Sequence, residues 1–134
     1  SLIEYLDIKN ITICLPMVVD TKQPLIFKPW RPGEKMVIGH YGISVPDNDQ
    51  TLIPDLIICP LLAYDSKGMR LGYGGGFYDR TILNFKQNVE KKVFTVGLAF
   101  SCQKYSGKLP INKNDKKIDS VLTEKGFKFF NTAN

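Results

Sequence analysis

Residues 70–80, RLGYGGGFYDR, combine the residue types that are needed to hold a phosphate group, and we call this segment the glycine loop. Four of its positions are glycine: Gly72, Gly74, Gly75 and Gly76. A backbone without Cβ atoms can bring its N–H groups directly against a phosphate. Arg70 opens the loop and Asp79 lies near its end, which supplies the two charge types that hold a polyphosphate and its magnesium ion. The loop therefore predicts a nucleotide site.

A glycine-rich surface turn is the alternative explanation, because clusters of glycine are common in loops. Phe77 and Tyr78 follow the glycines directly, whereas flexible linkers are built from Gly and Ser. These aromatic residues favour a functional loop. The spacing matches neither the GxxxxGKS/T pattern of a P-loop nor the GxGxxG pattern of dinucleotide-binding folds.

The elements on either side of the glycine loop follow an α/β pattern. Residues 56–63 form an unbroken apolar run, which is typical of a strand that is buried on both faces of a parallel sheet. After the loop, residues 78–87 predict a helix with Ile82, Leu83 and Phe85 on its inner side. Residues 93–100 predict another buried strand. The order strand, loop, helix, strand indicates an α/β fold.

The rest of the chain predicts shorter elements. Residues 1–9 are compatible with a short helix. Strands are expected at residues 11–19, which include Pro16, and at 25–28, 36–38 and 118–123. Gly126 is expected to end the last of these strands. The sequence has no internal repeat and no linker between domains, so we expect a single domain over residues 1–134.

The composition is that of an ordinary soluble globular chain, with 43% hydrophobic and 23% charged residues. No apolar run approaches the roughly 18 residues of a membrane span, and no secretory pattern is present, so we expect a cytoplasmic protein with no membrane partner. The three cysteines lie far apart and indicate neither a disulfide framework nor a zinc site. Cys14 and Cys59 are expected to be buried thiols, and His40 a loop residue.

A net charge of +5 raises the question of a nucleic-acid partner. The lysines are scattered, and no helix carries a basic stripe interleaved with aromatic residues, so we expect no nucleic-acid binding. The same charge would attract anionic small molecules such as nucleotides and polyglutamylated cofactors.

Three long stretches resemble the 5-formyltetrahydrofolate cyclo-ligases, also called 5,10-methenyltetrahydrofolate synthetases. They are PDLIICPLLAYDSKGMRLGYGGGFYDR at 54–80, VGLAF at 96–100 and LPINKNDKKIDSVLTE at 109–124; LPMV at 15–18 and FKPW at 27–30 fit the same order. The resemblance implies an enzyme that uses ATP and Mg²⁺ to convert 5-formyltetrahydrofolate, which can be polyglutamylated, into 5,10-methenyltetrahydrofolate. It also implies an open, mostly parallel sheet flanked by helices, in the three-layer, Rossmann-like arrangement. We expect a monomer, although no feature of the sequence sets the oligomeric state.

The resemblance further implies roles for individual residues. The ATP phosphates are expected to be wrapped by Arg70, Leu71, Gly72, Tyr73, Gly74, Gly75, Gly76, Phe77 and Tyr78, with Arg70 as the catalytic cation. Tyr73 and Phe77 are expected to face the folate as well, together with Tyr41 and Trp30. Asp79 and Asp115 match the carboxylates that are associated with magnesium.

Each role has an alternative in ordinary protein structure. Asp79 can be a carboxylate in the first turn of a helix, where it interacts with the helix dipole. Asp115 can be a solvated loop acid, and Asp119 is its nearest competitor for the metal. Tyr41 and Trp30 can be half-exposed packing residues.

The family pattern also includes a Lys, an Arg and a Glu in a segment ahead of the part that this sequence matches. The chain is therefore expected to be either a fragment of a longer protein or a shortened product. A truncated, non-catalytic protein that binds a nucleotide or folate is the alternative to the enzyme. Turnover of 5-formyltetrahydrofolate would separate the two.

Overall fold

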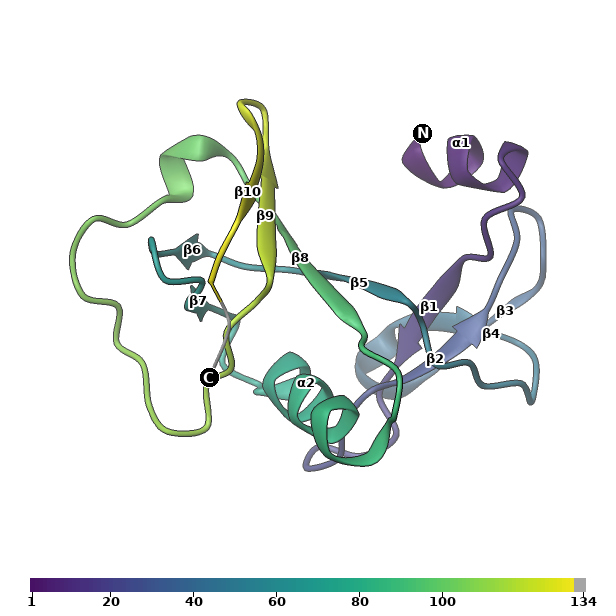
Figure 1. The fold of residues 1–134 in the computed structure, drawn as a ribbon. Coiled ribbons are helices and arrows are strands. Elements are labelled where there is room, and N and C mark those ends of the chain that lie inside the picture. Colours follow the sequence, from purple (N-terminus) through teal and green to yellow (C-terminus); the bar gives the residue numbers. More distant parts are fainter. Residues whose placement is uncertain (132–134) are drawn as a thin grey trace. The chain divides into compact units, whose positions relative to one another are not determined.

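The computed structural model describes residues 1–131 (Figure 1). The chain divides into two compact units, Ser1–Pro54 and Asp55–Asn134. The expectation of one cyclo-ligase-like domain over residues 1–134 stays a prediction. Within the described residues, no helix has the length and apolar character that a membrane crossing requires.

The first unit contains one helix and two antiparallel hairpin-like ladders. Helix α1 (Leu2–Ile8) begins at Ser1, whose hydroxyl accepts a hydrogen bond from the Glu4 N–H in a capping box. Strand β1 (Cys14–Met17) pairs with β2 (Ile26–Pro29), and β3 (Met36–Ile38) pairs with β4 (Ser44–Pro46). The 3₁₀ turn η1 (His40–Gly42) joins β3 to β4. The helix and three strands expected in this part are confirmed, although β1 is shorter than the predicted 11–19.

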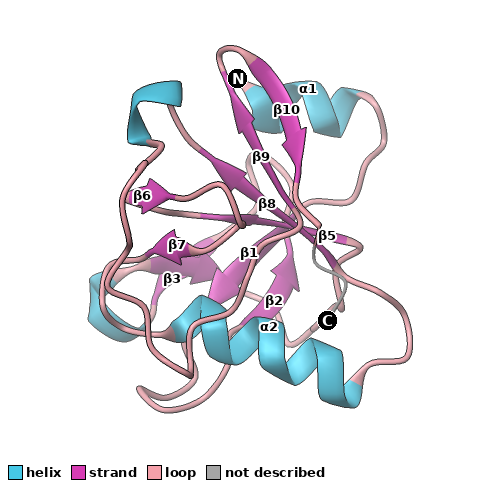
Figure 2. Ribbon diagram, turned by 60° about the vertical axis from the view of Figure 1, so that its left-hand side comes forward, coloured by secondary structure: helices cyan, strands magenta, loops and turns pink. Residues whose placement is uncertain are grey.

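The second unit is built on a four-stranded sheet with the order β10-β9-β8-β5. Strands β5 (Leu56–Cys59), β8 (Phe94–Leu98) and β9 (Ser120–Thr123) are parallel, and β10 (Gly126–Phe129) is antiparallel to β9. The short strands β6 (Ala63–Tyr64) and β7 (Arg70–Leu71) form a separate antiparallel pair. Helix α2 (Phe77–Asn88) connects this pair to β8, and η2 (Ser101–Gln103) follows β8 (Figure 2). The α/β prediction is confirmed at the level of a mixed sheet with helices.

Along β5, buried residues alternate with exposed ones. The prediction that this strand is buried on both faces was wrong. In β5, Ile57 and Cys59 are buried, whereas Leu56 and Ile58 are 49% and 44% exposed. The apolar run 56–63 also does not form one strand, because β5 ends at Cys59 and β6 begins at Ala63. An unbroken apolar run cannot distinguish one buried face from two, since both faces carry the same residue types.

Helix α2 confirms the predicted helix but corrects its inner face. Ile82 is buried together with Thr81, and Phe85 is half-buried on the same side. Leu83 is 37% exposed, so its expected inward position was wrong. Successive helix residues are about 100° apart, and the side defined by Thr81, Ile82 and Phe85 therefore excludes Leu83.

Strand β10 was not predicted, because Gly126 was expected to end the last strand. Gly126 has φ +109° and lies at the turn of a hairpin, from which the chain returns as β10 antiparallel to β9. Glycine is the residue that adopts this conformation without strain. A glycine between two strand-like runs therefore indicated a hairpin as well as a break.

Candidate active site

The conformation of the glycine loop requires glycine at several of its positions. Gly74 has φ +95°, and Gly76, which immediately precedes α2, has φ +67°. Side chains with a Cβ rarely adopt such values. At Gly75, a Cβ would lie 2.9 Å from the ring of Phe77, which is closer than packed atoms approach. The glycines therefore set the course by which the chain leaves β7 and enters α2.

Five successive backbone N–H groups of this loop could bind a ligand. Within residues 1–131, the backbone N–H groups of Gly72, Tyr73, Gly74, Gly75 and Gly76 have no hydrogen-bond partner. Two of the loop carbonyls do have partners, since Gly75 O accepts from the Arg80 guanidinium at 2.9 Å and Gly76 O from Arg80 N–H at 3.0 Å. The loop thus presents donors at the start of a helix of 12 residues, which is the arrangement that favours an anion.

Arg70 and Asp79 form a buried ion pair beneath the loop. Arg70 Nη2 lies 3.2 Å from Asp79 Oδ1, and the two side chains are 4% and 16% exposed. The Arg70 Nε atom is buried and has no hydrogen-bond partner among the described residues. The charge of Arg70 therefore acts mainly on Asp79 in this structure. Asp79 forms an ion pair in addition to any interaction with the helix dipole.

Asp79 Oδ1 also accepts a hydrogen bond from the backbone N–H of Lys116, at 2.9 Å. The adjacent Asp115 is held by its own loop, because its Oδ2 accepts from Asn112 N–H at 2.8 Å. The structure thus brings the segment that carries Asp115 to the first turn of α2. Sequence reasoning missed the contribution of Lys116, since a backbone N–H leaves no signal in the residue types.

Asp79 and Asp115 each have a carboxylate oxygen that could bind a magnesium ion. Asp79 Oδ2 and Asp115 Oδ1 have no partner within residues 1–131, so each side chain keeps one oxygen for a cation. No group of three or more His, Cys, Asp and Glu that could hold a metal occurs in that part of the chain. Mg²⁺ is commonly held by one or two carboxylates together with substrate phosphates and water, and such a site needs no third protein ligand.

Asp119, the alternative to Asp115, has a different function in the fold. Its Oδ2 accepts hydrogen bonds from the Thr95 N–H at 2.8 Å and the Thr95 hydroxyl at 2.9 Å. In return, Asp119 N–H donates to the Thr95 hydroxyl. These contacts join the start of β8 to the chain just before β9, which favours Asp115 over Asp119 as the second metal-associated acid.

Two buried groups lie beside the Arg70–Asp79 pair and are not in the predicted catalytic set. Burial raises the pKa of Cys59 to about 12, with Arg70 opposing and Asp79 adding to the shift. Burial likewise raises the pKa of the Tyr78 hydroxyl to about 12. The Arg70 guanidinium carbon lies 5.9 Å from the centroid of the Tyr78 ring. Both groups are therefore neutral at physiological pH, and Cys59 is a structural thiol as expected.

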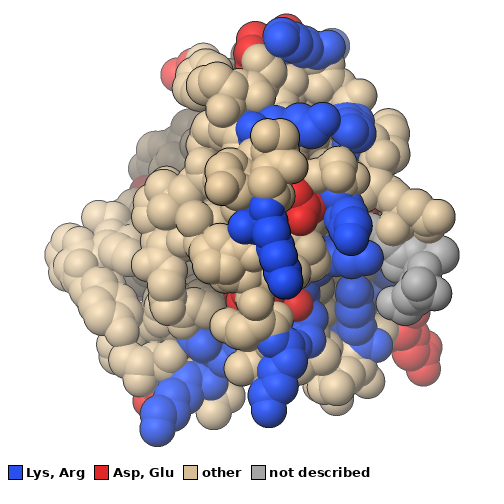
Figure 3. Space-filling view, turned by 90° about the vertical axis from the view of Figure 1, so that its left-hand side faces the viewer, with Lys and Arg blue, Asp and Glu red and all other residues tan. Residues whose placement is uncertain are grey.

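Basic side chains surround this part of the second unit. The segment 104–117 carries five lysines, Lys104, Lys108, Lys113, Lys116 and Lys117, against a single acid, Asp115. Figure 3 shows a face of the molecule on which Lys and Arg side chains gather and few acidic ones appear. This charge would raise the local concentration of an anionic ligand.

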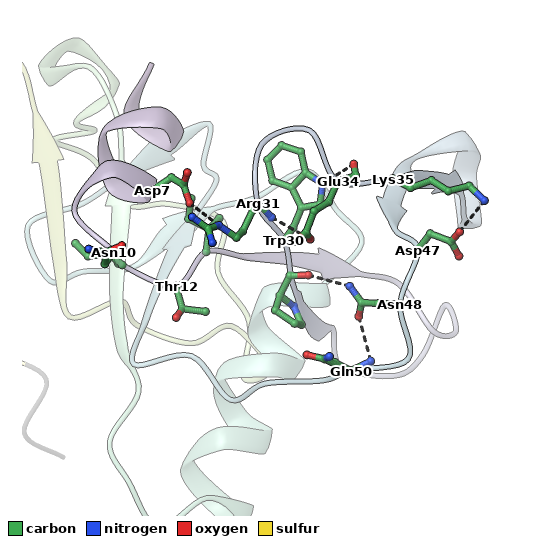
Figure 4. Close-up of a pocket in the computed structure, with 13 residues that line it drawn as sticks. Asp7, Asn10, Thr12, Trp30, Arg31, Glu34, Lys35, Asp47, Asn48 and Gln50 are labelled. Atoms are coloured by element: carbon green, nitrogen blue, oxygen red, sulfur yellow. Dashed lines mark hydrogen bonds and ion pairs between the residues drawn. The ribbon is translucent and has the colours of Figure 1, made fainter.

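Trp30 and Tyr41, the two remaining candidates, lie in the first unit. Trp30 lines a cavity of about 550 Å³, which we call the Trp30 pocket, together with Asn48 and Gln50 among others (Figure 4). Its indole N–H donates to the Glu34 carbonyl at 3.2 Å. Tyr41 is 65% exposed in η1 and has φ +58°, a left-handed conformation that is unusual for tyrosine. Tyr41 does not line the Trp30 pocket.

A comparison with known families assigns the chain. The model of the 5-formyltetrahydrofolate cyclo-ligase family matches residues 1–124. The chain belongs to this family. The match includes the glycine loop, Asp79 and Asp115, and the family resemblance of the sequence is confirmed.

Cyclo-ligases from several organisms are similar to this chain. The 5-formyltetrahydrofolate cyclo-ligase of Haemophilus influenzae is 38% identical over 91% of this chain and 66% of its own length. That of Escherichia coli K12 is 38% identical over 74% of this chain and 55% of its own length. The chain thus spans about 55 to 66% of the length of these relatives.

Solved structures of the family share the fold. The Aquifex aeolicus 5,10-methenyltetrahydrofolate synthetase has a TM-score of 0.74 and 28% identity, over 99% of this chain and 65% of its own. The Mycoplasma pneumoniae enzyme of the same name has a TM-score of 0.58 and 25% identity, over 88% of this chain and 59% of its own.

Proposed function

We propose that this cyclo-ligase family member acts in the ATP-dependent conversion of 5-formyltetrahydrofolate to 5,10-methenyltetrahydrofolate, with release of ADP and phosphate. Family membership supports the reaction, and the glycine loop with its free N–H groups is the observation that carries the ATP site. Because the chain spans only part of the length of its relatives, the proposal concerns the activity of the whole protein.

The chemistry explains why a phosphate site is needed. A formamide oxygen is a poor leaving group, so the formyl oxygen first attacks the γ-phosphorus of ATP and ADP departs. The neighbouring folate nitrogen then attacks the formyl carbon and loses its proton, while phosphate leaves with the oxygen. Ring closure yields the cyclic amidinium. Catalysis of such a transfer is mostly positioning and charge neutralisation, and no nucleophilic side chain is required.

The proposed roles follow the positions of the residues. The loop from Arg70 to Tyr78 would surround the phosphates, with its free N–H groups as donors. Asp79 and Asp115 would hold Mg²⁺, which would bridge phosphate oxygens and neutralise their charge. Tyr73, which is 74% exposed, and Phe77 would face the folate from the loop. The folate contacts expected of Tyr41 and Trp30 stay predictions.

We also propose the form of the substrate, the compartment and the oligomeric state of the enzyme. Lysines of the segment 104–117 would favour a polyglutamylated folate, whose tail is anionic. The three free cysteines are typical of a reducing compartment, and we propose a cytoplasmic monomer.

Turnover of 5-formyltetrahydrofolate with ATP and Mg²⁺, followed by methenyl absorbance, tests the function. In Gly75→Val we expect ATP affinity to fall at least tenfold, about 1.4 kcal/mol, because the added side chain would displace the loop backbone. Gly107→Val is the matched control, since a Cβ there would lie 2.8 Å from the Tyr105 ring, much as one at Gly75 would meet Phe77.

The outcomes separate three readings. Formation of methenyltetrahydrofolate, with ATP affinity lost in Gly75→Val and kept in Gly107→Val, supports the enzyme. ATP or folate binding without turnover supports the second candidate, a non-catalytic binding protein. Unchanged ATP affinity in a folded Gly75→Val variant contradicts the proposed site.

A further inference from the structure

Arg70 is enclosed by the loop that it opens. Its guanidinium lies against Gly72 on one side, where a Cβ would come within 3.0 Å of Nη1, and near the Tyr78 ring on another. Only 4% of the side chain is exposed. Little of this guanidinium is therefore accessible to a phosphate outside the loop.

The polar contact that Arg70 does make is with Asp79, and Asp79 connects three segments through one oxygen atom. Asp79 Oδ1 accepts from Arg70 Nη2 at 3.2 Å and from Lys116 N–H at 2.9 Å. These three residues, which we call the Asp79 clamp, join β7, the first turn of α2 and the segment that carries Asp115. Since Lys116 directly follows Asp115, the clamp ties the backbone beside Asp115 to the Asp79 carboxylate.

We propose that Arg70 is a positioning residue that acts through Asp79, and that the Asp79 clamp holds Asp79 and Asp115 in one arrangement toward the cation of MgATP. This inference rests on the proposed function. In this proposal the guanidinium binds Asp79 on the inner side of the loop, and the backbone N–H groups bind the phosphates.

The bonding pattern of the guanidinium supports this assignment. Arg70 Nε has no partner within residues 1–131, so the bond to Asp79 is the hydrogen bond that orients the group. A buried carboxylate that loses its cation is strongly disfavoured. Lysine is a point charge on a flexible stem and does not reproduce the planar fork of arginine, so Arg70→Lys keeps the charge and loosens the geometry.

The test compares ATP affinity with Mg²⁺ and in EDTA for the parent protein, Arg70→Lys and Arg70→Met. If Arg70 acts through Asp79, Arg70→Lys should weaken MgATP binding at least fivefold and change affinity for metal-free ATP less than twofold. Amide hydrogen exchange at Lys116 should be at least tenfold faster in Arg70→Lys than in the parent. Arg31→Met is the control for loss of an arginine that pairs with an aspartate elsewhere, and should change neither quantity.

Several outcomes overturn the proposal. Equal losses with and without Mg²⁺ indicate a direct phosphate contact, and unchanged affinity in both conditions shows that Arg70 has no role in binding. Arg70→Lys serves as the deciding variant if Arg70→Met does not fold. If the parent binds no ATP, the proposed function fails, and Lys116 exchange alone decides the clamp: faster exchange in Arg70→Lys sustains it, and an unchanged rate overturns it.

Discussion

Both units of the chain hold an arginine–aspartate pair of nearly the same length, but the surroundings of the two pairs differ. Arg70 Nη2 lies 3.2 Å from Asp79 Oδ1, and Arg31 Nε lies 3.0 Å from Asp7 Oδ1. The Arg70 side chain is 4% exposed, whereas that of Arg31 is 68% exposed. Water screens the exposed pair, while the buried charges depend on each other. Burial, and not distance, therefore decides what each pair contributes.

The same contrast separates the glycine loop from the Trp30 pocket. In the pocket, several polar side chains already have partners: Lys35 pairs with Asp47, and the Asn48 side chain donates to Pro29 O and accepts from Gln50 N–H (Figure 4). In the glycine loop, successive backbone N–H groups have no partner in the described part of the chain. Unused donors are the stronger indication of a ligand, because they gain bonds when an anion binds.

The largest expected effect is the loss of the buried pair. Arg70→Met should lower the free energy of unfolding by about 3–5 kcal/mol, because it leaves the Asp79 carboxylate buried without its cation. Urea denaturation at pH 7 measures this change. The double variant Arg70→Met/Asp79→Leu should regain part of the loss, since neither charge remains. A loss below about 1 kcal/mol in Arg70→Met would place the pair among ordinary surface ion pairs.

Alkaline pH should weaken the region around Arg70 through Tyr78. Its pKa is raised from 10.0 to about 12 by burial, so the unfolded chain loses the phenol proton first and stability falls as pH rises from 10 toward 12. The contribution of Tyr78 should be on the order of 2 kcal/mol. Tyr78→Phe should lack this contribution and keep the alkaline loss that comes from Cys59, whose pKa is also raised to about 12. Unfolding free energies at pH 9 and 11.5 test this expectation. Tyr41→Phe, which alters an exposed ring of the first unit, should show the same alkaline loss as the parent.

Gly74 and Gly33, one in each unit, have nearly the same backbone conformation, so the same substitution can be compared in both. Gly74 has φ +95° and Gly33 has φ +91°, and a Cβ at either would meet no atom within 4 Å. Gly74→Ala and Gly33→Ala should both lose about 1–2 kcal/mol of stability from backbone strain. Gly74→Ala alone should weaken ATP binding, by about tenfold or 1.4 kcal/mol, as measured by calorimetry. Equal ATP affinities in the two variants would argue against the glycine loop as the phosphate site.

The smallest expected effect belongs to the exposed pair. Arg31→Met should change the free energy of unfolding by less than about 1 kcal/mol, because the pair is accessible to water and salt. Denaturation in low and high salt measures both the effect and its screening. A loss as large as that of Arg70→Met would show that burial does not distinguish the pairs.

The sequence predicted the elements that have local signals. The apolar positions of residues 78–87 predicted α2, and the glycines predicted a loop at its start. Strand β10 was missed, although Phe127 and Phe129 alternate with Lys128, because Gly126 was interpreted as an end and not as a turn. The exposure of Leu56 and Ile58 was also missed, since it depends on which elements cover the sheet.

The candidate site was predictable in its residue types but not in its connections. The motif identified Arg70, Asp79 and Asp115, because glycine, arginine and aspartate are the residues that phosphate and magnesium require. The burial of Arg70 beneath the loop and the bond from Lys116 N–H to Asp79 could not be predicted. The bond from Lys116 joins segments 37 positions apart through a backbone atom. The burial of Arg70 depends on how the loop folds over its side chain. Residue types encode neither.

The most direct test of the account is an ATP titration of ¹⁵N-labelled protein in the presence of Mg²⁺, followed through the backbone amide resonances. The account predicts that the amides of Gly72, Gly74, Gly75 and Gly76 shift most and saturate together, because these N–H groups gain phosphate acceptors. Lys116 should shift with them if the Asp79 clamp responds to the cation. Saturable shifts confined to the Trp30 pocket, or no shift in the glycine loop, would contradict the assignment of the nucleotide site.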